Sequence, residues 1–238
     1  MSLILSIETG TDICSVALAR DGRLISLRES EEGRNHAQNL ALFIKEILDE
    51  NHIFPEELDA VAVGEGPGSY TGLRIGVSMA KGICYACGLP LIAIGSLQSL
   101  AVVAKEDYEA GLFEVDRFDE SVLCPMIDAR RMEVYAGLFD AAPEPISEVK
   151  AYVIEPDSFA AYTAAPAFVI FGNGAAKCRE VLALPNLVYC NVVPSARGMV
   201  GLAQKAFELG KFENLAYFEP FYLKDFVAGV SRKNLLRK

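Results

Sequence analysis

The fold is decided by the stretch from residue 3 to residue 30, which reads LILSIETGTDICSVALARDGRLISLRES. Three apolar runs in it have the composition of β-strands, and they cover Leu3–Glu8, Ile13–Arg20 and Arg23–Ser30. Turn residues separate the runs, since Thr9–Asp12 contains a glycine and Asp21-Gly22 is a two-residue hairpin signal. We therefore expect an antiparallel meander of three strands at the start of the chain.

After this meander the pattern changes to alternating helices and strands. Apolar residues recur with helical spacing over His36–Glu50, and a second helical pattern covers Thr71–Cys87. Short buried strands are predicted at Asp59–Gly64 and Leu91–Gly95. The order βββαβαβ places the chain in the α/β class, with crossover units that follow the meander.

A second unit is predicted beyond an acidic segment. Residues 105–120 hold seven acids and two bases, which is half of the net charge of −10. We therefore expect an N-terminal lobe over 1–105, an acidic linker over 106–120 and a less regular C-terminal lobe over 121–238. Strand-like runs in the second lobe are Val122–Asp128, Glu133–Phe139, Glu148–Ile154, Ala167–Phe171 and Leu187–Cys190, and helical runs cover 175–183 and 195–210.

The composition excludes several classes of protein. Hydrophobic residues make up 52% of the chain, which is enough to bury a core and excludes intrinsic disorder. The net charge of −10 argues against holding tRNA or DNA by bulk electrostatics, although residues 224–238 carry five bases and one acid. The six cysteines lie in apolar segments, and the start of the chain has no secretory pattern. We therefore expect reduced thiols, a cytoplasmic location and no membrane contact.

A glycine-rich loop, Gly64–Gly72, lies between a predicted strand and a predicted helix. Its amides could hold a phosphate, but neither P-loop nor GxGxxG spacing is present, and a tight turn for close helix packing is the other interpretation. The turn after the first strand is a weaker second candidate, with Glu8 or Asp12 near a metal–nucleotide. The candidate phosphate-loop residues are Glu8, Thr9, Gly10, Thr11, Gly66, Gly68, Ser69, Thr71 and Gly72.

Candidate catalytic side chains are few. The two histidines, His36 and His52, flank the first predicted helix, and neither belongs to an HExxH or a clustered metal motif. We interpret His36 as a capping or surface residue. Cys84 and Cys87 form a CxxC pair, but they share an apolar face of their helix, so we expect core thiols.

The helix predicted over 71–87 is apolar on two sides. Besides the stripe that faces the sheet, a second stripe contains Ile75, Met79 and Ile83. Such a helix must be covered on two sides. Leu42 of the first helix also points away from that helix's main stripe. Either the two helices pack on each other or another subunit completes the patch, and the sequence leaves both interpretations open.

Several blocks of the chain together resemble one protein family over nearly the whole length. They are Ile4–Thr11 with Cys14–Leu18, His36–Leu40, Gly66–Gly76, Ile127–Arg131 with Glu133–Tyr135, and Pro220–Lys224. The specific block is the third, which reads GPGSYTGLRIG. On these residues the chain resembles the TsaB (YeaZ) family of bacterial proteins, which take part in threonylcarbamoyladenosine modification of tRNA.

This resemblance implies two RNase H-like lobes of the actin/Hsp70/sugar-kinase type. It implies a non-catalytic subunit that pairs with a TsaD-type catalytic subunit and, with a TsaE-type ATPase, supports threonylcarbamoylation of the tRNA adenosine next to the anticodon. It also implies a homodimer in isolation, contact with tRNA only through the complex, and a partner surface on the first-lobe helices 36–50 and 71–87. The interface residues that we expect are His36, Leu40, Leu42, Phe43, Ile75, Met79 and Ile83.

Departures from the family pattern bear on cofactors. Glu8 stands where the fold usually has Asp, and Lys224 replaces the usual Arg, which keeps the charge but loses the bidentate fork. Residues 95–100 lack the histidine pair that TsaD-type paralogues use for metal. We therefore expect no catalytic residue, no metal and at most a weak ATP or ADP site. The alternative is a stand-alone nucleotide-dependent ATPase or kinase-like enzyme; the sequence offers no machinery for the peptidase M22 or glycoprotease name that such chains often carry.

Overall fold

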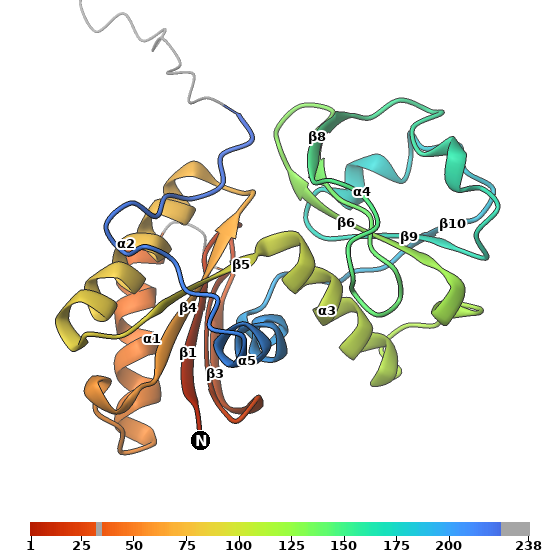
Figure 1. Cartoon of the computed structure of the whole chain (residues 1–238). Helices are drawn as coiled ribbons and strands as arrows, with labels where there is room; N and C mark the ends of the chain where they lie inside the picture. Colours follow the sequence, from red (N-terminus) through yellow and green to blue (C-terminus); the bar gives the residue numbers. More distant parts are fainter. Residues whose placement is uncertain (32–34, 225–238) are drawn as a thin grey trace, which may run out of the picture.

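Two five-stranded sheets organise residues 1–31 and 35–224, which are the residues that this computed structural model describes (Figure 1). The first sheet has the strand order β3-β2-β1-β4-β5, in which β3, β2 and β1 are antiparallel while β1, β4 and β5 are parallel. Its strands are β1 Leu3–Glu8, β2 Cys14–Arg20, β3 Arg23–Ser30, β4 Ala60–Gly66 and β5 Leu91–Gly95. The predicted meander with following crossover units is confirmed.

The second sheet repeats this order with later strands. It runs β8-β7-β6-β9-β10, and again the first three strands are antiparallel while the last two are parallel to the central one. Its strands are β6 Val122–Asp128, β7 Glu133–Ala136, β8 Lys150–Val153, β9 Phe168–Phe171 and β10 Leu187–Tyr189. Because both sheets have the same order and strand directions, the expected fold class of two RNase H-like lobes is confirmed.

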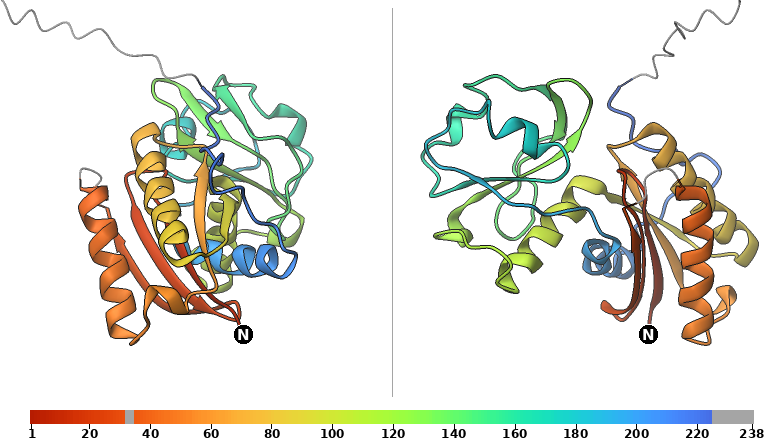
Figure 2. Two further views of the ribbon diagram at one scale, coloured as in Figure 1. Left: turned by 60° about the vertical axis from the view of Figure 1, so that its left-hand side comes forward. Right: turned by 180° about the vertical axis from the view of Figure 1, so that it is seen from behind.

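Helices cover both faces of the first sheet. One face carries α1 (His36–Glu50) and α2 (Tyr70–Cys87), and the face toward the second lobe carries α5 (Val200–Glu208) (Figure 2). Leu5 packs in the core beneath the helix pair, whereas Ile4 packs beneath α5, because successive strand residues point to opposite faces. Covering on both sides explains why β1 and most of β4 are buried.

The chain passes from the first lobe to the second and returns. Helix α3 (Ser96–Glu109) follows β5, and the short helix η4 (Ala196–Met199) brings the chain back to the first sheet. The predicted linker 106–120 therefore begins inside α3. Residues 196–222, which the sequence assigned to the C-terminal lobe, pack on the first lobe instead. The apolar inner face of the first sheet requires a cover, and this returning segment supplies it.

The remaining helical pieces are short. They are η1 Pro55–Glu57, η2 Phe118–Glu120, η3 Ala160–Tyr162 and α4 Ala175–Cys178. The helix predicted over 175–183 is thus a single turn, since the chain then leads Leu182 and Leu184 into the core beneath the second sheet. Within the part of the chain that the structure describes, no helix has both the length and the apolar character to cross a membrane.

Candidate functional site

The end of β1 and the start of α2 meet as a pair of touching turns. The Thr9 hydroxyl donates a hydrogen bond to the Gly72 carbonyl at 2.8 Å, and the Ser69 amide donates to the Gly10 carbonyl at 2.7 Å. The Ser69 hydroxyl caps α2 by accepting from the Gly72 amide at 3.3 Å. The two loops that the sequence predicts as phosphate-binding loops are therefore joined to each other by hydrogen bonds.

Glycine is required where these loops touch. A Cβ atom on Gly68 would lie 2.2 Å from the Gly10 carbonyl oxygen, and one on Gly72 would lie 2.1 Å from the Thr9 carbonyl oxygen. Both distances are far inside van der Waals contact, so the backbones can approach only without a side chain. Close packing of the two loops thus explains these glycines without invoking a ligand.

Glu8 ends β1 as a buried carboxyl group that is 1% exposed. The Gly10 amide donates to Oε1 at 2.7 Å, and the Ser96 hydroxyl donates to Oε2 at 2.8 Å. Burial raises the pKa of Glu8 above its usual 4.5, and the hydrogen bonds from Gly10 and Ser96 oppose that rise. Both carboxyl oxygens are therefore engaged within the protein.

A cleft of ≈ 600 Å³ lies between the lobes beside the paired turns. The paired turns with the start of α2 line it from the first lobe, the β6–β7 hairpin lines it from the second, and residues 221–224 also line it. Five of the residues predicted for phosphate loops line this cleft, namely Gly10, Thr11, Gly68, Ser69 and Thr71. The other four, which include Glu8, do not.

Two arginines of the β6–β7 hairpin also line the cleft, and sequence reasoning missed them as site residues. Arg130 and Arg131 have φ angles of 71° and 51°, in the left-handed region that favours glycine. The available signal was a pair of adjacent arginines in a hairpin turn that has neither glycine nor asparagine. In the sequence, residues 127–131 contribute only to the family resemblance.

The segment after α5 crosses the start of α2 and reaches the second lobe. Arg74 of α2 donates from Nε to the Tyr222 hydroxyl at 3.1 Å. Its guanidinium carbon also lies over the Tyr70 ring, 4.2 Å from the ring centroid. Lys224 then pairs with Glu133 of β7. The lysine that replaces the family's usual arginine thus still forms an ion pair between the two lobes. The basic residues at 225–238 lie outside the described residues.

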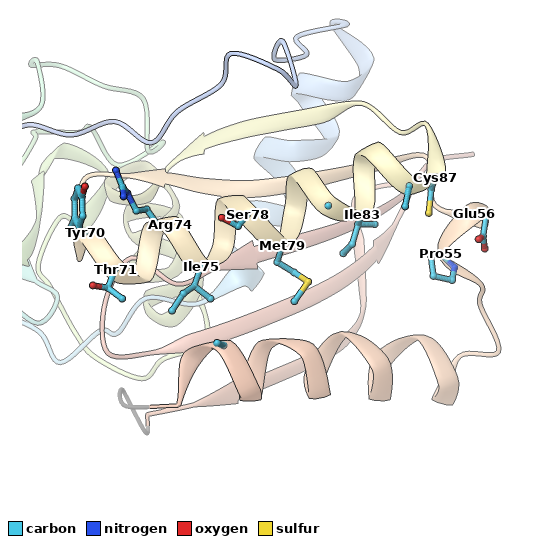
Figure 3. A pocket seen from close by; sticks show the side chains of 13 residues that line it. Pro55, Glu56, Tyr70, Thr71, Arg74, Ile75, Ser78, Met79, Ile83 and Cys87 are labelled. Atoms are coloured by element: carbon cyan, nitrogen blue, oxygen red, sulfur yellow. The ribbon is translucent and has the colours of Figure 1, made fainter.

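An apolar groove of ≈ 960 Å³ follows α2 on its side toward α1 (Figure 3). Ile75, Met79 and Ile83 point from α2 toward α1 and are partly buried against the first-lobe core. Ala37 is the contribution of α1 to the lining. The two helices therefore share a core and still leave an apolar surface beside α2, so each of the two sequence interpretations describes part of this region.

The remaining predicted interface residues all belong to α1 and differ in exposure. Leu42 is 46% exposed, outside the lining of the groove, and Phe43 is partly buried against the core. Leu40 is fully buried, because it shares the stripe of Ile44 that faces the sheet. The expectation that Leu40 contacts a partner is therefore corrected.

His36 is also buried, at 6% exposure, and is neither a surface residue nor a cap. Its Nε2 atom lies 2.8 Å from the Thr11 carbonyl oxygen, so this nitrogen donates. Its Nδ1 atom has no partner among the residues that the structure describes. The ring thus connects the start of α1 to the turn after β1, which is why it lies inside and not at a partner surface.

The CxxC cysteines differ from each other. Cys84 is 1% exposed, and burial raises its pKa to about 11, so its prediction as a core thiol is confirmed. Cys87 is only partly buried and lines the end of the groove. All six cysteines are free thiols. Within residues 1–31 and 35–224, no three His, Cys, Asp or Glu side chains gather closely enough to hold a metal ion.

Comparison with known proteins places this geometry in a family. The family model described as TsaD, tRNA N6-adenosine threonylcarbamoyltransferase, matches residues 30–183. The tRNA threonylcarbamoyladenosine biosynthesis protein TsaB of Bacillus subtilis is 32% identical over 136 residues, which are 57% of this chain and 54% of that protein. TsaB of Escherichia coli is 29% identical over 232 residues, covering 94% of this chain and 96% of that one.

The solved structures agree with the sequence relatives. YeaZ from Pseudomonas aeruginosa is 28% identical, has a TM-score of 0.74 and covers 94% of this chain and 100% of its own. A second Pseudomonas aeruginosa structure, described as similar to peptidase YEAZ, has a TM-score of 0.78 at the same identity. The matched part of the chain spans about half the length of the Bacillus subtilis relative and nearly all of the Escherichia coli one. The chain therefore belongs to the TsaB (YeaZ) family.

Proposed function

We propose that this chain is a non-catalytic subunit in tRNA threonylcarbamoyladenosine biosynthesis. It pairs with a TsaD-type catalytic subunit, and a TsaE-type ATPase completes the assembly that modifies the adenosine next to the anticodon. The chain works in the cytoplasm, forms a homodimer when the partner is absent and meets tRNA only within the complex. The names of the relatives support the pathway, and the surface of the first lobe supports pairing.

The apolar groove along α2 is the observation that carries the pairing. Isolated apolar side chains are common on protein surfaces, but a continuous apolar groove is typical of an interaction site. Ile75, Met79 and Ile83 lie at the i, i+4 and i+8 positions of one helix, so they present one continuous stripe to a partner. Arg74 and Ser78 stand at its border and supply a polar rim.

The likeness to the TsaD family suggests which partner fits. The TsaD family model matches residues 30–183, which include α1 and α2, so a TsaD-type protein carries a corresponding helix pair. Two related subunits can pack through the same surface about an approximate two-fold axis, as identical subunits do in a symmetric dimer. Pairing with a second copy of this chain and pairing with a TsaD-type subunit then use one surface and exclude each other.

The paired turns favour a supporting role over the stand-alone ATPase or kinase. The two loops that would bind phosphates are in contact, because the Ser69 amide donates a hydrogen bond to the Gly10 carbonyl. Glu8, one of the two carboxylates expected near a metal–nucleotide, accepts hydrogen bonds on both oxygens, from the Gly10 amide and the Ser96 hydroxyl. A nucleotide-hydrolysing enzyme needs these groups free to bind phosphate and metal.

Size-exclusion chromatography with light scattering tests the proposal. The purified chain should elute as a homodimer alone and as a stoichiometric heterodimer when mixed with the TsaD-type protein of the same organism. Met79→Glu and Leu42→Glu should each abolish pairing, because each buries an unpaired charge at the interface. Val153→Glu is the matched control, because Val153 is 65% exposed on β8 of the second lobe.

Three outcomes would count against the proposal. Separate elution of the wild-type chain and its partner, repeated with ATP and tRNA present, would refute pairing. Normal pairing of both the Met79 and the Leu42 variants, with unchanged circular dichroism, would refute the placement of the interface. Sustained ATP turnover by the chain alone would favour the stand-alone enzyme.

A further inference from the structure

The segment over residues 213–224, which we call the strap, runs along the first lobe toward the second (Figure 1). At its start the Glu213 amide donates to the Leu91 carbonyl of β5 at 2.9 Å. Phe218 is buried in the first-lobe core, and the Lys81 side chain of α2 donates to the Phe218 carbonyl at 3.1 Å. The first part of the strap is therefore fixed on the first lobe.

The end of the strap connects the two lobes. The Phe221 amide donates to the Glu65 carbonyl of β4 at 2.8 Å, and three residues later Lys224 pairs with Glu133 of β7 in the second lobe. The Lys224 ammonium group also lies 5.7 Å from the ring centroid of Tyr135, on the same strand. The side chains of the ion pair are 35% and 26% exposed, so water screens their attraction only in part. Residues 221–224 therefore join the lobes at the cleft that they line.

Arg74 belongs both to the apolar groove along α2 and to the anchorage of the strap. It lines one end of the groove beside Tyr70 (Figure 3), and its Nε atom donates to the Tyr222 hydroxyl at 3.1 Å. The ring centroids of Tyr222 and Tyr70 are 5.0 Å apart, and Tyr70 lines the groove and the cleft alike. A partner in the groove therefore meets the two residues on which Tyr222 rests.

The strength of the bond between Arg74 and Tyr222 depends on what covers the groove. In the uncovered chain this bond is exposed, so water competes for both groups and the bond contributes little. A partner that covers the groove excludes this water, and a hydrogen bond from a charged group strengthens as the local dielectric constant falls. A covered guanidinium group also needs acceptors for its N–H groups, and the Tyr222 hydroxyl is one. Covering the groove thus favours the docked position of the strap.

We propose that the strap couples pairing at the α2 groove to closure of the cleft between the lobes. In the joined state Tyr222 rests on Arg74 and Lys224 pairs with Glu133, as in this structure. In the released state both contacts are broken, and the lobes move apart about the two chain crossings, α3 and residues 190–195. A partner that binds the joined state more tightly shifts the chain toward it, and release of the strap weakens pairing by the same factor. This inference rests on the proposed pairing through the groove.

Two conservative variants of the full-length chain test the coupling. Glu133→Gln breaks the ion pair with Lys224 on the second lobe, outside the groove, and Tyr222→Phe removes the hydroxyl but keeps the ring beside Tyr70. Isothermal titration with the TsaD-type protein of the same organism measures the pairing Kd. We expect Kd to rise about threefold or more in each variant, because the fraction of chains in the joined state falls.

Each variant has a matched control that makes the same chemical change elsewhere. Glu148→Gln removes one carboxylate from the same lobe, where Glu148 pairs with Lys150 in an exposed ion pair. Tyr217→Phe removes one hydroxyl from the strap itself, at a residue that is 83% exposed. Both controls should keep Kd within about 1.5-fold of the wild type, because an exposed group of this kind contributes little. Circular dichroism checks that all four variants fold.

The separation of the lobes is measured independently of affinity. Dyes for single-molecule energy transfer are attached to encoded azide side chains at Leu24 on β3 and Val153 on β8, so that the native thiols stay unlabelled. Both positions are exposed, and they lie on different lobes. We expect the partner to narrow the distribution of transfer efficiency in the wild type, and Glu133→Gln to broaden it in the free chain.

The outcomes separate the coupling from the proposed function. Weaker pairing of Glu133→Gln and Tyr222→Phe, with unchanged controls and a broader lobe distribution, supports the coupling. Pairing by the wild type that Glu133→Gln leaves within about 1.5-fold, or a lobe distribution that the partner does not change, overturns the coupling and leaves the proposed function standing. Failure of the wild-type chain to pair refutes the proposed function and the coupling together.

Discussion

Replacing Gly72 with alanine should separate the paired turns and destabilise the first lobe. The new Cβ atom would lie 2.1 Å from the Thr9 carbonyl oxygen, so one backbone must move away from the other. Overpacking of this kind costs about 1–3 kcal/mol. The move also lengthens the buried bond from the Thr9 hydroxyl to the Gly72 carbonyl, which contributes about 1 kcal/mol.

One term acts in the opposite direction. Gly72 lies inside α2, where alanine is favoured over glycine by about 1 kcal/mol. The expected net loss in the free energy of unfolding is therefore about 2 kcal/mol, or about 4–8 °C in Tm for a chain of this size. Urea and thermal unfolding followed by circular dichroism measure both quantities on the purified chain.

Gly82→Ala is the matched control, because it makes the same change in the same helix. A Cβ atom on Gly82 would meet nothing within 4 Å, so this variant should gain about 0.5–1 kcal/mol. The two variants are thus expected to change stability in opposite directions. If Gly72→Ala stays within about 0.5 kcal/mol of the wild type while Gly82→Ala shows its gain, the contact between the turns does not exist in solution.

Two further predictions concern buried titratable groups. Because burial raises the pKa of Glu8, the folded state holds this proton more tightly than the unfolded state, so Glu8 makes the free energy of unfolding fall as pH rises from about 4.5 through the folded pKa. Glu8→Gln should remove this part of the pH dependence and should be more stable than the wild type at pH 7.5. Urea unfolding of both proteins at about pH 4.5 and at pH 7.5 measures this effect. The same change in the free energy of unfolding between the two pH values in both proteins would contradict the prediction. Cys84, at 1% exposure and a pKa of about 11, should resist iodoacetamide at neutral pH until the protein unfolds, whereas the partly exposed Cys87 should react first. Mass spectrometry of the labelled peptides would contradict this if both thiols reacted equally in the native protein.

The first lobe was predictable because its signals are local. The β2–β3 hairpin signal Asp21-Gly22 and the helical spacing of 36–50 each need only neighbouring residues, and the structure places β3 and α1 at the predicted bounds. The path of the chain after residue 195 was not predictable in this way. The apolar spacing of α5 would be the same on either sheet. Helix α5 packs on the first sheet because the inner face of that sheet is apolar and otherwise uncovered.

The candidate site was predictable in its parts but not in its arrangement. The sequence identified both loops, yet it could not reveal that Thr9 and Gly72, 63 residues apart, would be in contact. The burial of His36 depends on the same contact region, because its partner is the Thr11 carbonyl on the turn after β1. The φ angles of Arg130 and Arg131 are likewise set by the hairpin that surrounds them, so they cannot be inferred from the composition of the sequence.

The return of the chain to the first sheet has a consequence for synthesis on the ribosome. The five strands of the first sheet are complete once residue 95 has been made, but the helix that covers their inner face ends at residue 208. At a synthesis rate of about 5–20 residues per second, the apolar face stays uncovered for about 5–20 s before α5 is complete. The nascent chain therefore exposes this apolar face to solvent while the second lobe is made, and the core of the first lobe can be complete only after residue 208 has been made.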